Sequence, residues 1–205
     1  MESHRPQRMS NPNQVAIPPV IETPRLHLRA AAADFAEVIN EAIVESLDAL
    51  RPWMPWVHPT PTVDHTRQFL TGAEAHSQAR NSFTYASFLK RNGRFVGVTG
   101  LHGMDWSVPK VELGYWVRTS ETGQGFATES VEALTTLAFQ TLKVNRVEML
   151  ISVRNERSSR IPIRLGFVHE ATMRRYDRSI PGGPIDDLRV YAKISEQVAS
   201  RDGDR

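Results

Sequence analysis

The chain has 205 residues, 40% of them hydrophobic and 23% charged, with a formal net charge of +2, which are ordinary values for one soluble globular domain. It has no cysteine, which excludes disulfides, zinc-thiolate sites and cysteine nucleophiles. The small net charge gives no reason to expect a nucleic-acid partner, and no apolar stretch approaches the roughly 20 residues that span a bilayer. We therefore expect a cytoplasmic protein with neither a membrane nor a nucleic-acid partner.

Composition divides the chain into three regions. Residues 1–20 are rich in Pro, Asn, Gln and Arg and contain no apolar signal core, so we expect a disordered tail there rather than an export signal. Residues 21–195 carry the periodic apolar patterns of one folded domain. Residues 196–205 are polar and are expected to form a second tail.

In chain order, the apolar periodicity predicts the following elements. Leu26 and Leu28 alternate with polar residues, as in a strand, and Asp34 is placed to cap the first helix. The expected elements of the first half are a strand over 24–31, helices over 35–50 and 64–80, and a hairpin of strands over 83–90 and 94–101. Those of the second half are a strand over 110–118, a helix to about 142, a strand over 145–153, a helix over 156–165, and strands over 167–175 and 186–194. This order predicts a mixed α/β, or α+β, domain with a single sheet and helices on its faces.

The segment SETGQGFATES joins a predicted strand to a predicted helix. Gly123 and Gly125 lack a Cβ, so a ligand can approach the backbone closely, and the N-terminus of the helix attracts an anion through its N–H groups and its dipole. Thr128 offers a further donor in the first turn, and Arg118 precedes the segment. Residues 123–128 are therefore a candidate pyrophosphate cradle. The alternative is a flexible turn before a packed helix, because the glycine spacing matches neither a P-loop nor a Rossmann fingerprint.

Three segments resemble a known superfamily. ELGYWVRTSETGQGFATES resembles the acyl-CoA-binding segment of the Gcn5-related N-acetyltransferases (GNAT): Gly125 and Ala127 match the last two positions of its motif, Gln/Arg-x-x-Gly-x-Gly/Ala, and Thr122 replaces the first. NERSSRIPIRLGF resembles the superfamily's Asn-x-x-Ser…Leu-Gly-Phe segment. LRPWMPWVHPTPTVDHTRQFL resembles the proline–tryptophan loop of its Rim-type branch, the ribosomal-protein serine/alanine N-acetyltransferases. The resemblance covers roughly residues 21–195, the expected N-acetyltransferase domain.

The resemblance implies a fold and a reaction. The fold is a GNAT-like single mixed sheet, mostly antiparallel, with a splayed central strand pair and flanking helices. The reaction transfers an acetyl group from acetyl-CoA, the cosubstrate, directly to a primary amine in a ternary complex, and no cysteine is present to carry an acyl intermediate. The acceptor could be a protein N-terminal α-amine, such as that of a ribosomal protein, or a small-molecule amine. A homodimer is an expectation at the level of the family.

The resemblance also assigns contacts with the cofactor. These are expected at Val117, Arg118, Gly123, Gln124, Gly125, Phe126, Ala127, Thr128, Asn155 and Ser158. The backbone N–H of Val117 would polarise the thioester carbonyl. Asn155 is a good helix N-cap on physical grounds alone, and the resemblance adds a contact with the pantetheine arm. Ser158 is a candidate general acid for the leaving thiolate; the alternative is a hydroxyl bonded to the backbone of its own helix.

The base that deprotonates the amine has three carboxylate candidates. Glu112 lies on the strand expected to contact CoA, and Asp177 follows the strand after Leu-Gly-Phe, where the Rim-type branch has a functional carboxylate. These two carry equal weight, and Glu170 is the third. The alternative for each is a surface carboxylate or an ion pair with an arginine, and a water-relayed base would satisfy the same chemistry.

The tryptophan-rich loop is the candidate acceptor site. Trp53, Met54 and Trp56 could form an apolar wall over the acceptor, or they could fill the hydrophobic core. The histidines show no ligand spacing on one helix face, so we expect no metal: His58, His65, His76 and His102.

Other functions stay open at this point. The chain could be a CoA-binding sensor or interaction module with little catalysis, or an N-acyltransferase that uses another acyl-CoA, such as succinyl-CoA. A nucleotide-phosphate binder would prefer ATP or NAD to CoA, and the missing P-loop and Rossmann patterns weigh against it.

Overall fold

The computed structural model describes residues 16–178 and 180–195. Residues 1–15 of the expected N-terminal tail and the whole of the expected C-terminal tail, 196–205, lie outside the described residues. Val20, which closes the expected N-terminal tail, begins strand β1 (Val20–Glu22), an element that the periodicity did not predict.

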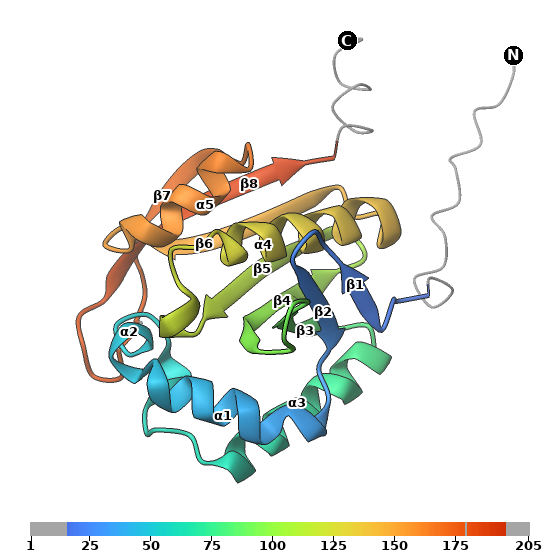
Figure 1. The fold of residues 1–205 in the computed structure, drawn as a ribbon. Coiled ribbons are helices and arrows are strands. Elements are labelled where there is room, and N and C mark those ends of the chain that lie inside the picture. The colour runs from blue at the N-terminus through green and yellow to red at the C-terminus, as the bar shows by residue number, and fades with distance from the viewer. Residues whose placement is uncertain (1–15, 179, 196–205) are drawn as a thin grey trace, which may run out of the picture.

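One eight-stranded sheet runs through the domain in the order β1-β2-β3-β4-β5-β6-β8-β7 (Figure 1). All neighbouring strands are antiparallel except β5 and β6, which are parallel. The strands after β1 are β2 (Leu26–Ala30), β3 (Phe83–Leu89), β4 (Phe95–Asp105), β5 (Lys110–Val117), β6 (Arg146–Ser152), β7 (Val168–Asp177) and β8 (Asp186–Ile194). The single, mostly antiparallel mixed sheet confirms the predicted fold class, and each predicted strand is present.

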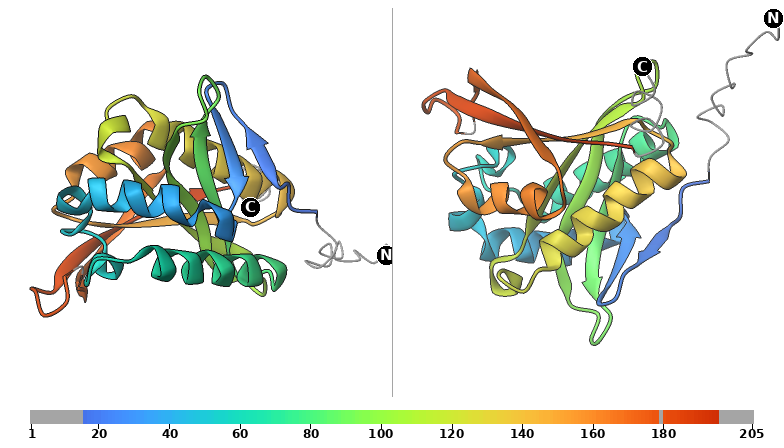
Figure 2. Two further views of the ribbon diagram at one scale, coloured as in Figure 1. Left: turned by 60° about the horizontal axis from the view of Figure 1, so that its bottom comes forward. Right: turned by 90° about the horizontal axis from the view of Figure 1, so that it is seen from above.

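Helices cover both faces of the sheet (Figures 1 and 2). They are α1 (Ala36–Glu45), α2 (Leu47–Leu50), α3 (Val63–Gln78), α4 (Phe126–Thr136) and α5 (Glu156–Arg164). On one face Ile43 of α1 and Leu70 of α3 share a buried cluster with Trp116 of β5. On the other face Leu134 of α4 is buried with Leu113 of the same strand. β5 contributes side chains to both clusters because successive side chains of a strand point to opposite faces.

The helix predicted over 35–50 is divided in two. α1 ends at Glu45, and Ser46 leaves the helical region with φ −105° and ψ 7° before α2 begins. The buried Ser46 hydroxyl accepts a hydrogen bond of 2.9 Å from the backbone N–H of Thr119. This partner lies 73 residues further along the chain, so no local pattern could have signalled the division.

The two parallel strands in the middle of the sheet separate along their length. Their register consists of Lys110↔Arg146, Val111↔Val147 and Glu112↔Glu148. Beyond the last of these pairs β5 continues to Val117 and β6 to Ser152. The register therefore fits a splayed central strand pair, with an opening between β5 and β6 beyond Glu112.

Candidate active site

α4 begins directly after the glycine turn. Gly123 and Gly125 have φ of 79° and 83°, in the left-handed region that side chains rarely adopt. Gly125 is the N-cap of α4, and no side chain of the described residues caps this end of the helix. The first-turn N–H groups of Phe126, Ala127 and Thr128 are therefore available to an anion, and the helix dipole favours negative charge at the same place. This is the geometry that the predicted cradle requires.

Arg25, in the turn between β1 and β2, packs against the start of α4. Its Nη1 donates to the carbonyl of Gln124 at 2.9 Å, and its Nε donates to Oε2 of Glu129 at 2.7 Å. The guanidinium lies over the Phe126 ring, 4.5 Å from the ring centroid. A cation is thus fixed beside the cradle. No local pattern indicated a role for Arg25, because its contacts are about a hundred residues away along the chain.

Arg118 is directed away from the cradle. Its side chain is buried, and its Nε donates to Oε2 of Glu45 at 3.0 Å while Nη2 donates to Oε1 of Glu41 at 3.1 Å. The hydrogen bond from Arg118 holds the pKa of Glu45 at about 2, with help from the N–H of Ser120. The guanidinium is engaged by two carboxylates of α1, so Arg118 is a structural link in this geometry rather than a partner of the cradle.

The backbone of β5 presents N–H groups to the opening. The N–H of Arg118 donates to the carbonyl of Val96 on the β4 side, at 2.8 Å. Since alternate N–H groups of a strand point to opposite edges, the N–H of Val117 points to the β6 side. The β5–β6 register ends before this residue. The geometry at Val117 therefore matches its expected role beside a thioester carbonyl.

A pair of hydroxyl groups spans the opening. Oη of Tyr115, on β5, lies 2.6 Å from Oγ of Ser158, in the first turn of α5. Burial raises the pKa of Tyr115 to about 12, although the hydrogen bond with Ser158 and the charge of Arg157 oppose the shift. The Ser158 N–H donates to Oδ1 of Asn155 at 3.1 Å, which makes Asn155 the N-cap of α5, as its residue type predicts. The sequence analysis did not identify Tyr115, because its contact with Ser158 joins residues 43 positions apart.

Glu112 lies where the strands begin to separate, beside Glu148 in the register. Oε2 of Glu112 is 3.9 Å from Nδ1 of His102 on β4. Burial raises the pKa of Glu112, and the charges of Glu148 and Asp177 raise it further, whereas His102 opposes the shift. Of the two best base candidates, Glu112 thus lies beside His102, whereas Oδ1 of the exposed Asp177 accepts a hydrogen bond of 2.7 Å from the backbone N–H of Arg178.

Glu170, the third base candidate, is held by an arginine. Its Oε1 and Oε2 accept hydrogen bonds from Nη1 and Nη2 of Arg146, at 3.0 and 2.6 Å. This pairing lowers the pKa of Glu170. An exposed carboxylate with a depressed pKa is a weak base, so the alternative of an ion pair describes Glu170 better.

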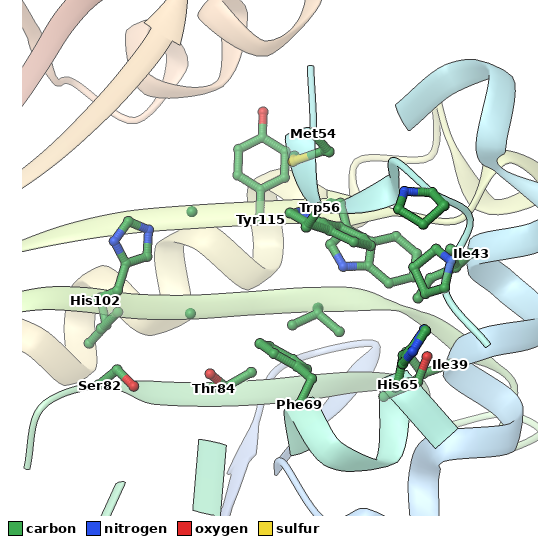
Figure 3. A pocket seen from close by; sticks show the side chains of 18 residues that line it. Ile39, Ile43, Met54, Trp56, His65, Phe69, Ser82, Thr84, His102 and Tyr115 are labelled. Carbon is green, nitrogen blue, oxygen red and sulfur yellow. The ribbon is translucent and has the colours of Figure 1, made fainter. Parts of the chain in front are cut away.

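An apolar pocket of about 590 Å³ lies between β4 and β5 on one side and α1, α3 and the tryptophan-rich loop on the other (Figure 3). Met54 and Trp56 line this acceptor pocket, together with Tyr115 and His102. Trp53 is not among its lining residues; its ring instead lies 5.8 Å from the guanidinium carbon of Arg154. The loop therefore supplies two of its three predicted acceptor residues to the pocket.

The described part of the chain contains neither a metal-ligand cluster nor a membrane-spanning helix. Among residues 16–178 and 180–195, no group of three or more His, Asp or Glu side chains is arranged to hold a metal ion. None of the helices within those residues has the length and apolar character to cross a bilayer.

Comparison of the sequence with known protein families identifies the domain. The family described as "Acetyltransferase (GNAT) domain" matches residues 25–168, more than half of the chain. The chain belongs to the GNAT acetyltransferases.

Relatives of this GNAT chain include ribosomal-protein acetyltransferases of the Rim type. YdaF of Bacillus subtilis (strain 168), provisionally named a ribosomal N-acetyltransferase, is 29% identical over 162 residues, which are 79% of this chain and 87% of that protein. A ribosomal-protein-serine acetyltransferase of Escherichia coli (strain K12) is 22% identical over 82% of this chain and 92% of its own. A solved structure of RimL, described as a ribosomal L7/L12 α-N-protein acetyltransferase in complex with CoA, has 22% identity and a TM-score of 0.81. That match covers 86% of this chain and 98% of the RimL chain, and it shows the shared fold.

In this GNAT domain several of the residues predicted from sequence lie on elements that flank one opening, whereas Arg118, Glu170 and Trp53 do not belong to it. The cradle, Val117 and the Asn155–Ser158 turn lie along it, and Glu112 lies at its closed end. Gln124, another expected cofactor contact, is exposed, and its amide donates to Glu121 at 3.0 Å.

Proposed function

We propose that the chain transfers an acetyl group from acetyl-CoA to a primary amine, by direct attack in a ternary complex in the cytoplasm. The observation that carries the proposal is that Tyr115 of β5 connects two candidate sites on opposite faces of the sheet. The uncapped N-terminus of α4 lies on one face of the sheet and the acceptor pocket lies on the other. Tyr115 contacts Ser158 and also lines the pocket, so it belongs to both sites.

The donor half of the site binds acetyl-CoA. The backbone N–H groups of the cradle would hold the pyrophosphate, and the cation of Arg25 would add attraction from the side. The turn from Asn155 to Ser158 would contact the pantetheine arm, which places the thioester in the opening. The N–H of Val117 would stabilise the oxyanion that forms on the thioester carbonyl.

The chemical step moves one acetyl group and one proton. The neutral amine attacks the thioester carbonyl, a C–N bond forms, and the C–S bond breaks to release CoA as a thiolate. Before the attack Glu112 would take the proton from the ammonium form of the amine, because a raised pKa makes a carboxylate a stronger base near neutral pH. His102 lines the pocket and Glu112 does not, so this proton would pass through His102 or a water. The paired hydroxyls of Tyr115 and Ser158 would donate a proton to the thiolate, and the proton that the nitrogen loses as the amide forms would restore the hydroxyl.

Calorimetric titration with acetyl-CoA, ATP and NAD tests the donor half of the site. We expect selective binding of acetyl-CoA, weakened when Gly125 is changed to Val. Release of free CoA thiol, followed with each of a panel of primary amines, then tests transfer. Absence of acetyl-CoA binding would overturn the proposal. Binding without transfer to any amine would favour a CoA sensor.

A further inference from the structure

The two ends of the acceptor pocket differ in their surroundings. His102 and Ser82 lie at one end of the pocket in Figure 3, and Ile39, Ile43 and His65 lie at the other. The end with His102 is next to Glu112, since His102 lies 3.9 Å from that carboxylate. The reacting amine belongs at this end, so the rest of the acceptor extends towards α1 and the tryptophan-rich loop.

The pocket has no charged partner for the body of the acceptor. Of the described residues that line it, none is an Asp, Glu, Lys or Arg, and the polar groups belong to histidines, hydroxyl side chains, two tryptophan indoles and glycine backbone. A second ammonium or a carboxylate on the acceptor would lose its hydration there without gaining an ion pair, at a cost of several kcal/mol. This disfavours polyamines, aminoglycosides and acidic peptides.

Two aromatic side chains are left partly exposed at the pocket. Trp56 is 45% exposed and Phe69 is 58% exposed, although both line the pocket, one from the loop and one from α3 (Figure 3). An aromatic or aliphatic ring between them would remove apolar surface from water on both partners. A peptide would instead bring an N–H and a C=O for every residue, and the few polar side chains of the lining could not pair with them all.

From this lining we infer that the acceptor is a small primary amine carried on a neutral, ring-bearing apolar body, such as an arylalkylamine. The inference rests on the proposed acetyl transfer and narrows its acceptor. The volume of about 590 Å³ falls in the range of small-molecule sites.

The test compares acceptors with the full chain and acetyl-CoA. Release of CoA thiol is measured with phenethylamine, with spermidine, and with short peptides that begin with Ser or Ala. We expect kcat/KM to be highest for phenethylamine. Phe69→Ala and Trp56→Ala should each lower kcat/KM for phenethylamine about tenfold or more while leaving the Kd of acetyl-CoA unchanged. Val44→Ala is the matched control, because Val44 is on α1, is 51% exposed and is not among the lining residues.

Two outcomes would overturn the inference while the proposed function stands. One is transfer to spermidine or a peptide with kcat/KM equal to or above that for phenethylamine. The other is a phenethylamine rate that Phe69→Ala and Trp56→Ala do not change. If no amine is acetylated, quenching of tryptophan fluorescence by phenethylamine, reduced in Trp56→Phe because Trp116 also lines the pocket, would support the pocket and reject the catalysis. Absence of quenching would reject the pocket as well.

Discussion

At the scale of the single residue, opposing effects act on the pKa of the Glu112 carboxyl. Burial and the charges of Glu148 and Asp177 raise its pKa, and His102 lowers it. A base must be deprotonated to act, so kcat/KM should rise with pH through this raised pKa, above the ordinary carboxyl range of about 4.3. Glu112→Gln should remove that limb of the pH profile and lower kcat about 10²- to 10⁴-fold.

Asp177→Asn separates the two base candidates. Removing the charge of Asp177 should lower the pKa of Glu112, so the limb of the profile should move to lower pH and remain visible. Glu148→Gln is the control, since Glu148 raises the same pKa and was never a candidate base. The assignment would be reversed if Asp177→Asn abolished the limb and Glu112→Gln only displaced it. The measurement is kcat/KM over about pH 5 to 9 with a saturating donor.

Tyr115 offers a second prediction for a single residue. Its pKa of about 12 keeps the hydroxyl protonated across the neutral range, so it can donate to a thiolate. Tyr115→Phe keeps the ring and removes only the hydroxyl that contacts Ser158. We expect kcat to fall about 10- to 100-fold, with the Kd of acetyl-CoA within about twofold of the wild type.

Ser158→Ala completes the comparison. It retains the backbone N–H that Asn155 caps, so α5 should keep its start. If the two hydroxyls act as one unit, the double variant should be no slower than Tyr115→Phe alone. Losses that multiply would show that each hydroxyl acts separately.

At the scale of the elements, the turn before α4 depends on glycine at position 125. An alanine at Gly125 would have to keep φ near 83°, and its Cβ would lie 3.4 Å from Nη2 of Arg25. The left-handed conformation costs a side chain about 1–2 kcal/mol. Gly125→Ala should therefore lower the free energy of unfolding by about 1 kcal/mol and weaken acetyl-CoA binding several-fold.

Gly72→Ala is the matched control for this turn. Gly72 lies inside α3, and a Cβ there would meet no atom within 4 Å. Alanine favours a helix interior over glycine by about 1 kcal/mol, so this variant should be more stable and bind acetyl-CoA normally. Chemical unfolding and calorimetry check both variants. Equal acetyl-CoA affinity in Gly125→Ala and wild type would contradict the role of the turn.

The elements that the sequence predicted well have strong local patterns. The strand expected over 110–118 is β5 (Lys110–Val117), and that expected over 145–153 is β6 (Arg146–Ser152). Alternation of buried and exposed side chains is a property of the segment itself, so the sequence contains it. The end of α1 at Ser46 depends on a contact with Thr119, and tertiary contacts of this kind override local propensity.

The same distinction applies to the site. The glycine turn and the Asn155 cap are local motifs, and both could be located from a few neighbouring residues. Arg25 and the Tyr115–Ser158 pair come from segments that only the fold brings together. The pairing of Glu112 with His102 likewise needs the β4–β5 register, which no single segment specifies.

For the whole molecule, Arg118 and Glu45 connect the α1 layer to the segment that leads into the cradle. Oε1 of Glu45 also accepts a hydrogen bond of 2.9 Å from the N–H of Ser120. Because the folded pKa of Glu45 is lowered to about 2, its contribution to stability should be present above about pH 4.3 and be lost as pH falls towards 2. Glu45→Gln should therefore lower the free energy of unfolding by about 1–2 kcal/mol at pH 7 and by much less at pH 2.

Glu41→Gln is the control for this link, since Glu41 makes one contact with Arg118 and its side chain is 70% exposed. Its loss should stay below about 1 kcal/mol, as for other exposed ion pairs. Thermal unfolding of the three proteins across this pH range supplies the comparison. A Glu45→Gln deficit that is the same at pH 7 and pH 2 would show that packing, rather than charge, joins α1 to the cradle segment. A deficit that fades with acid, accompanied by weaker acetyl-CoA binding at pH 7, would show that this ion pair positions the cradle from the opposite face of the sheet.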